Sequence, residues 1–434
     1  MSSSSLIRYL LNNSTTFNWN VRVVDQNIQL VERKLNGHPN GTALSFNALN
    51  TAERRPEIEK ADLVISMLPA RFHVEVALDC IDLKTNLITP SYVSPEMRAL
   101  DEKAKEAGVI LMNEIGVDPG IDHMSAMKII DHIEEIGGKM HSFKSFCGGL
   151  IAPESDNNPW NYKFTWNPRN VVVAGQGSAA CFIEENQYKY IPYTKLFSRT
   201  DVMAIPGFGE FEGYANRDSL SYRPVYELEN IPTIYRGTLR RPGYCKAWDA
   251  FVQLGLTDDS YKMAHSEDLS PRTFINSFLP FKDQISIEEK FKKAVGFDED
   301  IFERVKWLGF FSDETPLGLE NASPAQILEK ILVNKWTLDP KDKDMLVMFH
   351  EFVYEIEGKK KKINSYMVNI GEDVTYTSMS NTVGLPAAIA AKMILNNQIS
   401  LIGVQIPIQS EVYNPILKEL EEYGIQFKED ELDA

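Results

Sequence analysis

The first part of the chain alternates short apolar runs with amphipathic stretches. From Leu6 to Leu11 the apolar residues fall at helical spacing, and Ser2 to Ser5 before them can cap a helix. Helical stretches such as Pro95 to Ala107 separate the apolar runs that follow. The predicted strands are Val21 to Val24, Ala43 to Phe46, Leu63 to Leu68, Leu87 to Thr89 and Val109 to Met112. This alternation predicts a Rossmann-type doubly wound parallel sheet, an α/β fold.

One part of that fold is missing from the pattern. A dinucleotide-binding domain should start with a strand, then a Gly-rich turn, then its first helix. Here the helix at Leu6 follows the start of the chain directly, so the first strand and the phosphate loop are not seen. Two explanations are open: a start codon assigned too far downstream, or a natural chain that has lost tight dinucleotide binding. We favour the first, because a sheet without its middle strand leaves buried ladder groups unpaired.

The pattern changes from about residue 125. Longer and less regular strands are expected at His141 to Phe146, Asn170 to Val173 and Thr233 to Leu239, which indicates a mixed α/β substrate domain. Residues 245 to 335 are mostly helical in pattern and indicate an inserted helical lobe. A hairpin follows, with Lys359 to Lys362 as a solvated basic turn. The expected domains are a Rossmann-type domain (1–124 with 384–410), a substrate domain (125–245 and 340–383), a helical insertion (246–339) and a C-terminal helix and tail (411–434).

Composition narrows the class of protein. The chain has 434 residues, a net charge of −16 and 43% hydrophobic residues, which fits a globular protein of two or three domains. The negative charge argues against nucleic acid or an anionic membrane as the main partner. The 4 cysteines lie far apart without metal-ligand spacing, so we expect no disulfide and no metal. Without a long apolar run or a signal-peptide pattern, a cytoplasmic protein is expected.

Polar side chains follow the predicted parallel strands. Ser91 and Tyr92 come just after one strand and Asp118 just after the next, so all three should reach one crevice at the carboxyl edge of the sheet. An Asp-Pro-Gly turn at residues 118–120 needs no ligand when taken alone. Asp25 ends the second strand, where an acid binds the adenosine ribose and disfavours a 2′-phosphate. NAD is therefore favoured, NADP is the alternative, and a surface acid is the other interpretation of Asp25.

Several longer motifs occur in one order along the chain. They are Glu114 to His123, Cys147-Gly148-Gly149, Ala152-Pro153-Glu154, Tyr162-Lys163-Phe164, Asn216 to Ser219, Arg236 to Arg240, Lys306 to Gly309 and Phe310 to Asp313. In this order they resemble the saccharopine dehydrogenase family, most closely its glutamate-forming branch, which is also called saccharopine reductase. The resemblance covers nearly the whole chain.

The resemblance implies a set of site residues. The implied substrate contacts are Ser91, Tyr92, Asp118, Arg217, Thr238, Leu239 and Arg240. The implied cofactor contacts are Asp25, Phe46, Asn47, Met67, Leu68, Val117, Asp118, Pro119 and Asn167. Gln26 stands where NADP-using fungal members carry an Arg, which again favours NAD. His73 is expected to be a structural residue at a helix start rather than a catalytic one.

The resemblance also implies a reaction. The glutamate-forming branch interconverts saccharopine with glutamate and α-aminoadipate semialdehyde through an imine, in lysine metabolism. We expect Asp118 to hold the substrate amine, with Tyr92 and Cys147 as further proton handlers. The Arg residues around Arg236 to Arg241 suit a substrate with three carboxylates. The alternatives are a reductive condensation like that of carboxynorspermidine dehydrogenase, and a non-catalytic binding protein. A homodimer is expected.

Overall fold

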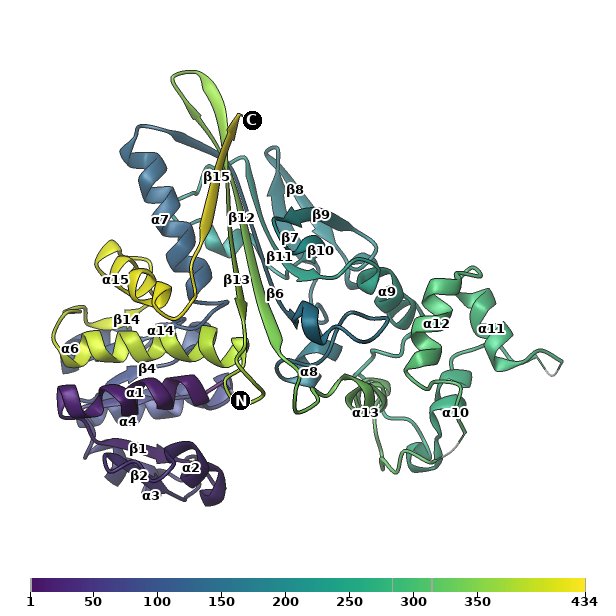
Figure 1. Ribbon diagram of the computed structural model, residues 1–434, viewed down its shortest axis with the longest axis horizontal. Coiled ribbons are helices and arrows are strands. Elements are labelled where there is room, and N and C mark those ends of the chain that lie inside the picture. Colours follow the sequence, from purple (N-terminus) through teal and green to yellow (C-terminus); the bar gives the residue numbers. More distant parts are fainter. Residues whose placement is uncertain (1, 283, 314, 434) are drawn as a thin grey trace. The chain divides into compact units, whose positions relative to one another are not determined.

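The computed structural model describes residues 2–282, 284–313 and 315–433 (Figure 1). These residues form two compact units. The first unit holds the N-terminal residues up to Met140, together with Tyr354–Lys361 and Met367–Glu431. The second holds His141–Val353, Lys362–Tyr366 and the C-terminal residues from Leu432. No helix in the described part of the chain combines the length and apolarity needed to span a membrane.

The first unit is an α/β unit with short strands. Its strands are β1 (Val21–Val24), β2 (Gly41–Leu44), β3 (Leu63–Ile65), β4 (Asn86–Ile88), β5 (Ile110–Met112) and β14 (Gly403–Gln405). Its helices are α1 (Ser4–Phe17), α2 (Ile28–Leu35), α3 (Thr51–Ile58), η1 (Ala70–Phe72), α4 (His73–Leu83), α5 (Pro95–Arg98), α6 (Asp101–Ala107), α7 (Ile121–Glu135), α14 (Ser378–Leu395) and α15 (Ser410–Glu421).

The pairs among these six strands are all parallel, but the strands form two separate sheets. β1 pairs with β2, and the other sheet has the order β14-β5-β4-β3. Among residues 2–282, 284–313 and 315–433, no strand joins β1 to β3. The division falls where a dinucleotide-binding fold has the central strand that the sequence pattern lacks. β5 is buried along its whole length, as expected for a parallel strand covered on both faces, whereas β1, β2 and β3 are only partly buried.

Two helices far apart in the sequence, α1 and α14, lie side by side (Figure 1). A glycine permits the contact, because a Cβ at Gly384 would lie 2.9 Å from the Leu6 amide nitrogen. Ser5 fixes the crossing point: its amide donates to Ser380 Oγ at 3.0 Å, and its hydroxyl donates to Asn381 Oδ1 at 2.6 Å. The Ser5 amide belongs to the first helical turn, where no intrahelical acceptor exists. The Ser380 hydroxyl on α14 therefore accepts a hydrogen bond from an amide that would otherwise have no acceptor.

The second unit is built around a mixed sheet. Its strands are β6 (Lys139–Ile151), β7 (Ala180–Glu184), β8 (Gln187–Ile191), β9 (Thr200–Ile205), β10 (Gly209–Ala215), β11 (Thr233–Arg240), β12 (Asp344–Ile356) and β13 (Lys359–Ile370), and the sheet also includes β15 (Lys428–Asp433). The order is β15-β13-β12-β6-β11-β10-β9, with β7 pairing to β11 and to β8. β6 and β11 are parallel, whereas β9, β10 and β7 pair antiparallel. The predicted mixed α/β architecture is confirmed.

Helices occupy much of the rest of this unit. They are η2 (Pro153–Ser155), α8 (Pro168–Val172), η3 (Tyr193–Lys195), η4 (Leu220–Tyr222), α9 (Tyr244–Leu254), η5 (Ser266–Asp268), α10 (Pro271–Asn276), α11 (Ile287–Ala294), α12 (Glu299–Trp307) and α13 (Pro324–Trp336). The predicted helical character of residues 245 to 335 is confirmed. Buried aromatic rings join α9 to α13, since Trp248 stacks on both Tyr244 and Trp336. Such rings bury large apolar areas and stabilise the junction.

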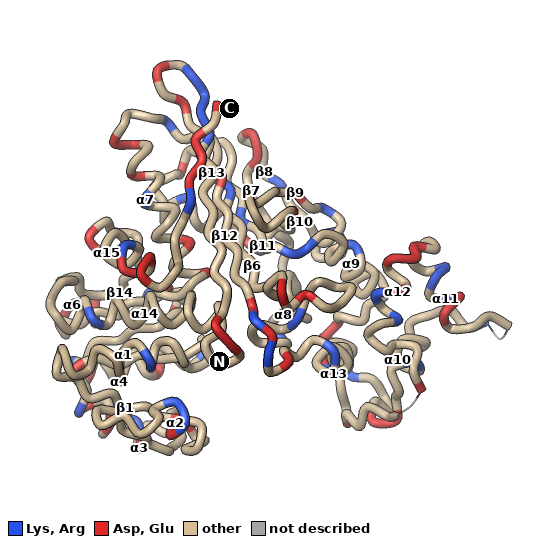
Figure 2. The backbone as a smooth tube through the Cα atoms, viewed as in Figure 1, with Lys and Arg blue, Asp and Glu red and all other residues tan. Residues whose placement is uncertain are grey.

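Two local predictions were wrong. Asn170 to Val173 is not a strand, because Asn167 caps a helix there and Pro168 occupies its first turn. Lys359 to Lys362 is not the hairpin turn. The turn is Glu357-Gly358, whose φ angles of 51° and 75° suit a tight hairpin. The lysines begin β13 beside the acidic strand β15 (Figure 2), and Lys361 Nζ lies 2.7 Å from Glu431 Oε1.

Candidate functional site

The parallel strands of the first unit bring three segments to one edge of the sheet. The Ser66 amide donates to the Ile88 carbonyl at 2.8 Å, and the Thr89 amide donates to the Met112 carbonyl at 2.9 Å. The residues after β3, β4 and β5 therefore start side by side. This is the edge at which open α/β sheets bind ligands.

Tyr92 and Asp118 meet at this edge, as the sequence predicts. The Tyr92 hydroxyl donates to Asp118 Oδ1 at 2.7 Å. Tyr92 is 47% exposed although it is a large aromatic residue, and Asp118 is half-buried. A phenol bonded to a carboxylate on an accessible surface can hold a polar ligand and move a proton.

The loop that carries Asp118 is closed on itself. The Gly116 amide donates to the Pro119 carbonyl at 3.0 Å, and the Asp122 amide donates to the Val117 carbonyl at 3.0 Å. The Asp118-Pro119 peptide is cis. Gly120 has a φ of 144°, and a Cβ there would lie 2.2 Å from the Gly116 carbonyl oxygen. Only glycine fits this position.

Glu114 is a second acid in this loop, and the sequence analysis did not single it out. Its Oε2 lies 2.7 Å from Nε2 of His123, which is fully buried, and its Oε1 accepts a hydrogen bond from the Val93 amide at 2.8 Å. Glu114 also has a φ of 55°, which is unusual for a residue with a side chain. A buried acid in a strained conformation marks a constrained site. In the sequence, the signal for this contact is His123, nine residues after Glu114. That spacing alone does not predict that the two side chains meet.

His73 lies beneath the same edge. It begins α4 and is 3% exposed. Its Nδ1 lies 2.9 Å from Ser66 Oγ, and its Nε2 lies 2.9 Å from Ser91 Oγ and 2.8 Å from Thr89 Oγ1. Burial lowers the pKa of the imidazole to about 4. The expectation of a residue at a helix start is confirmed, and the structure adds its contact with Ser91.

The residues predicted to bind a cofactor lie after β1, β2 and β3. Asp25 is exposed, and its Oδ1 accepts a hydrogen bond from the Asn27 amide at 2.8 Å. Asn47 Oδ1 accepts from the Gln26 side-chain amide at 3.3 Å, so the ends of β1 and β2 are linked. Phe46, Met67 and Leu68 are half-buried, and Leu68 packs on the apolar core behind them. Among the predicted cofactor residues of the Asp118 loop, Val117 and Pro119 are buried.

These residues fit the adenosine end of a dinucleotide. Exposed Asp25 at the end of a parallel strand suits ribose hydroxyls. Lys34 lies nearby, and its Nζ donates to Ser3 Oγ at 2.6 Å. Burial lowers the pKa of Lys34, and the charge of Asp25 acts in the opposite direction. The half-buried Lys34 ammonium is suited to a phosphate, and the exposed Asp25 carboxylate is suited to a hydroxyl.

Arg240 is the most unusual predicted residue of the second unit. Its side chain is 2% exposed and its guanidinium carbon lies 5.0 Å, 5.3 Å and 5.8 Å from the ring centroids of Tyr162, Tyr244 and Tyr214. Nε has no hydrogen-bond partner, and one terminal nitrogen donates to the Leu239 carbonyl at 2.7 Å. Within the described residues, no Asp or Glu forms an ion pair with Arg240. A buried cation without an acid is costly unless an anion is bound.

Other predicted site residues lie on β11, the strand that carries Arg240, or on a strand that pairs with it. Thr238 of β11 lies beside Cys147 of β6 and opposite Tyr214 of β10. Close strand approach depends on Gly148, where a Cβ would lie 2.6 Å from the Leu239 carbonyl oxygen. Cys147 is buried, with 9% of its surface exposed. Leu239 is fully buried, and its carbonyl accepts a hydrogen bond from Arg240.

Two predicted residues of this unit lie elsewhere. Arg217 is exposed on the segment after β10, and its amide donates to Asn216 Oδ1 at 2.9 Å. Asn167 is exposed and caps α8 through hydrogen bonds from the amides of Arg169 and Asn170. The side-chain oxygen of Asn167 is thus already used by the helix. The basic residue Lys246 is paired within the protein, since its ammonium forms an ion pair with Asp298.

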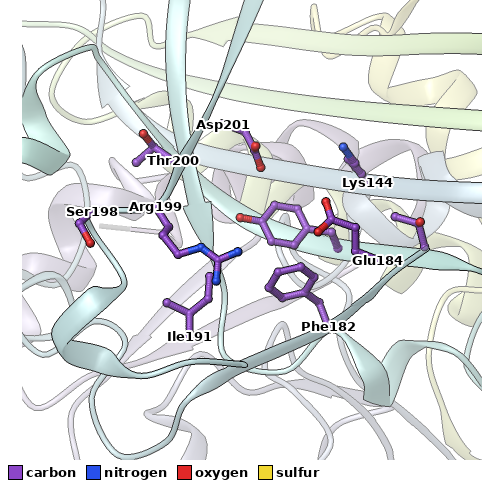
Figure 3. Close-up of a pocket in the computed structure, with 10 residues that line it drawn as sticks. Lys144, Phe182, Glu184, Ile191, Ser198, Arg199, Thr200 and Asp201 are labelled. Carbon is purple, nitrogen blue, oxygen red and sulfur yellow. The ribbon is translucent and has the colours of Figure 1, made fainter. Parts of the chain in front are cut away.

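A hollow of about 310 Å³ lies over the sheet of the second unit (Figure 3). Phe182 and Tyr235 form its buried wall, with ring centroids 4.6 Å apart. Four charged side chains surround the hollow: Lys144, Glu184, Arg199 and Asp201. None of the predicted site residues lines it. This hollow is therefore separate from the predicted chemistry.

The fold and these residues define a class: a protein with a Rossmann-type dinucleotide-binding unit and a mixed α/β unit that carries a buried arginine. Comparison with protein families agrees. Residues 2–112 match the saccharopine dehydrogenase NADP binding domain, and residues 116–425 match the saccharopine dehydrogenase C-terminal domain. The chain belongs to the saccharopine dehydrogenase family.

Individual relatives are similar over most of the chain. The saccharopine dehydrogenase [NADP(+), L-glutamate-forming] of Saccharomyces cerevisiae is 35% identical over 404 residues, which cover 90% of this chain and 89% of that protein. The enzyme of the same name from Pyricularia oryzae is 34% identical over 432 residues, with 94% and 93% covered. The mitochondrial alpha-aminoadipic semialdehyde synthase of Rattus norvegicus is 37% identical, but the match spans only 40% of that longer protein.

Solved structures show the same fold. The apo saccharopine dehydrogenase (L-Glu forming) of Saccharomyces cerevisiae matches with a TM-score of 0.89 and 32% identity, covering 100% of this chain and 98% of that one. A homospermidine synthase from Legionella pneumophila matches with a TM-score of 0.53 at 9% identity, which shows the fold alone. The NADP binding domain match supports NADP, which was the alternative, and does not support the preference for NAD drawn from Asp25.

Proposed function

We propose that this chain is a saccharopine dehydrogenase of the L-glutamate-forming type, which uses NADP. It interconverts saccharopine with glutamate and α-aminoadipate semialdehyde. Support comes from the two family matches, which together span most of the chain, and from the relatives of that name, which match over most of their own length.

The observation that carries the proposal is the environment of Arg240. Its guanidinium is fully buried among three tyrosines, and an acid on the neighbouring strand, Glu212, accepts a hydrogen bond from the Cys245 amide instead of forming an ion pair with it. A substrate carboxylate would supply the missing anion in bidentate geometry. Saccharopine carries three carboxylates, so it offers such a group.

The chemistry places clear demands on the site. Bound NADP would supply the hydride acceptor for the carbon next to the secondary amine of saccharopine. That amine must first be neutral, so a proton has to leave its nitrogen; Asp118, held by the Tyr92 hydroxyl at 2.7 Å, is the acceptor we assign. The resulting imine adds water and its C–N bond breaks, which yields glutamate and the semialdehyde. We assign Tyr92 and Cys147 to proton transfer during those later steps.

NADP rather than NAD is the cofactor we assign. The repulsion expected from Asp25 is offset, since its carboxylate is bonded to the Asn27 amide and lies near Lys34. Lys34 is the cation we assign to the 2′-phosphate. Its ammonium is half-buried, which strengthens an interaction with an anion.

Two other functions were considered from the sequence. A carboxynorspermidine-type reaction would use a polyamine, and a buried Arg without an acid is unsuited to a cationic substrate. A non-catalytic binding protein would keep the Tyr92–Asp118 pair without turnover. No structural observation favours either one.

A single assay tests the proposal. The purified chain is incubated with saccharopine and either NADP or NAD, and reduced cofactor is followed by absorbance. We expect turnover with saccharopine, faster with NADP at equal concentration, and none with carboxynorspermidine. A chain that binds NADPH in the micromolar range but oxidises no saccharopine would contradict the assignment. Binding of saccharopine without NADPH binding would support the non-catalytic alternative.

The assembly and the location remain predictions. We propose a homodimer, which light scattering of the purified chain tests: a mass of one chain would contradict it. We also propose a cytoplasmic location, although the mammalian relatives are named mitochondrial. Fluorescence microscopy of the tagged protein tests the location.

A further inference from the structure

His73 makes contacts that a helix start does not require. The residue that precedes α4 is Phe72, and no side chain caps this helix end. The His73 amide donates to the Ala70 carbonyl of η1, and the imidazole does not cap the helix. It reaches instead to three hydroxyls on two other segments: Ser66 after β3, and Thr89 and Ser91 after β4.

The imidazole is neutral in the folded protein, and neutrality limits its hydrogen bonds. Burial lowers its pKa to about 4, so near neutral pH the ring has a single N–H. With that hydrogen on Nε2, the ring donates toward Ser91 Oγ at 2.9 Å, and Nδ1 accepts from the Ser66 hydroxyl. Ser91 then keeps its own hydroxyl hydrogen for a ligand. With the hydrogen on Nδ1, Nε2 would instead accept from Thr89 at 2.8 Å or from Ser91 at 2.9 Å, so the tautomer with the hydrogen on Nε2 is the one that leaves the Ser91 hydrogen available.

The backbone around Ser91 is held from the other side. The Glu114 amide donates to the Ser91 carbonyl at 3.1 Å, and Glu114 Oε1 accepts from the Val93 amide at 2.8 Å. Glu114 is in turn bonded to buried His123. Ser91 is therefore fixed through its side chain by His73 and through its backbone by Glu114, one residue before Tyr92. A side chain held by such contacts is pre-organised, which lowers the entropy lost on binding.

We propose that His73 is a positioning residue for substrate binding: its neutral imidazole fixes the Ser91 oxygen so that the Ser91 hydroxyl donates to a carboxylate of the substrate. The inference rests on the proposed function, because it takes saccharopine as the ligand. His73 touches no substrate atom and acts through Ser91. Ser66 gives the imidazole its second anchor, on the segment that leads to Met67 and Leu68.

A double-mutant cycle in saccharopine binding tests the proposal. The full chain is titrated with saccharopine by calorimetry, in the wild type and in His73→Leu, Ser91→Ala and the double variant. We expect His73→Leu to raise Kd about tenfold. We expect the double variant to bind no more weakly than Ser91→Ala alone, because His73 acts only through that hydroxyl. Weakening by the product of the two single effects would overturn the proposal.

Two further variants separate positioning from folding. His73→Gln keeps an amide that can reach the Ser91 oxygen, so part of the affinity should return although the ring is gone. If His73→Gln binds as weakly as His73→Leu while both remain folded, the proposal fails. His132→Leu is the matched control, since His132 is exposed on α7, and it should bind like the wild type.

The same titration separates the two levels of inference. A wild-type chain that binds no saccharopine overturns the proposed function and this inference with it. A wild type that binds saccharopine, with His73→Leu equal to it, overturns only the positioning role.

Discussion

The Tyr92 hydroxyl donates a hydrogen bond of 2.7 Å to Asp118 Oδ1 across two loops of one sheet edge. The two residues are not neighbours in the sequence, since α5, α6 and β5 lie between them. The pairing exists because β4 and β5 are adjacent parallel strands with Leu87 opposite Leu111. The hydrogen bond links the Tyr92 phenol to Asp118, the acid that we propose as acceptor of the substrate amine's proton.

Replacing either partner should reduce catalysis. We expect Tyr92→Phe and Asp118→Asn each to lower kcat/KM for saccharopine oxidation by about 10²-fold, because groups that transfer protons typically contribute that much. Since the two residues act as one unit, the double variant should lose much less than the product of the single losses. Steady-state kinetics with saturating NADP measures both effects.

Tyr188→Phe is the control for this pair, because Tyr188 is 57% exposed on β8 and should tolerate the loss of its hydroxyl. If Tyr92→Phe and Asp118→Asn keep kcat/KM within a factor of about three, the proton-handling roles are wrong.

Arg240 should matter for binding more than for stability. Arg240→Met removes a buried charge that has no acid partner, and replacing buried charges by apolar groups is often neutral or stabilising. A substrate carboxylate would lose its buried partner, so we expect Kd for saccharopine to rise about 30-fold or more. Calorimetry measures the affinity, and urea unfolding measures the stability.

Arg241→Met is the matched variant on the next residue. The Arg241 guanidinium lies over Phe211 at 4.2 Å and donates to the Phe208 carbonyl, so it is engaged within the protein. It should leave saccharopine affinity nearly unchanged. Equal loss of affinity in the two variants would show that general charge, and not Arg240 itself, holds the substrate.

Sequence patterns were sufficient for the fold class and for the Tyr92–Asp118 edge. Strand ends of a parallel sheet converge by topology, so polar residues after β4 and β5 could be placed together from their order alone. The same reasoning could not find Glu114 or His123, because their contact depends on a φ of 55° at Glu114. Nor could it show that tyrosines surround Arg240, since Tyr162, Tyr214 and Tyr244 are far apart in the sequence.

The error at Asn170 to Val173 has a local cause. β-branched valines favour strands, but Asn167 and Pro168 form a helix start, and Val171 and Val172 are buried on that helix. The preference for NAD, which the family match does not support, rested on a single residue. It treated Asp25 as an isolated charge, whereas the structure places Lys34 near it.

The stability of the protein should fall in mild acid because of His73. Its pKa is about 4 in the folded protein, below the value of 6.5 for an exposed histidine, so the unfolded chain binds a proton that the folded chain resists. No loss is expected above pH 6.5. Between pH 6.5 and 4 the free energy of unfolding should fall by up to roughly 3 kcal/mol. Urea unfolding at pH 7, 5.5 and 4.5 measures it, and His73→Gln should weaken the dependence. An unchanged pH profile in His73→Gln would contradict the assignment to His73.

Gly120 should be the least replaceable glycine of the first unit's ligand-binding edge. A Cβ there would lie 2.2 Å from the Gly116 carbonyl oxygen, and φ is 144°, so Gly120→Ala must break the closed loop that carries Asp118. We expect it to destabilise the protein by more than about 2 kcal/mol and to lower kcat/KM strongly. Gly108→Ala is the matched control: its φ of 73° is also positive, but nothing lies within 4 Å of the added Cβ. It should cost only about 1 kcal/mol, with activity retained. Equal costs in urea unfolding would show that backbone conformation, and not the contact with Gly116, requires glycine at position 120.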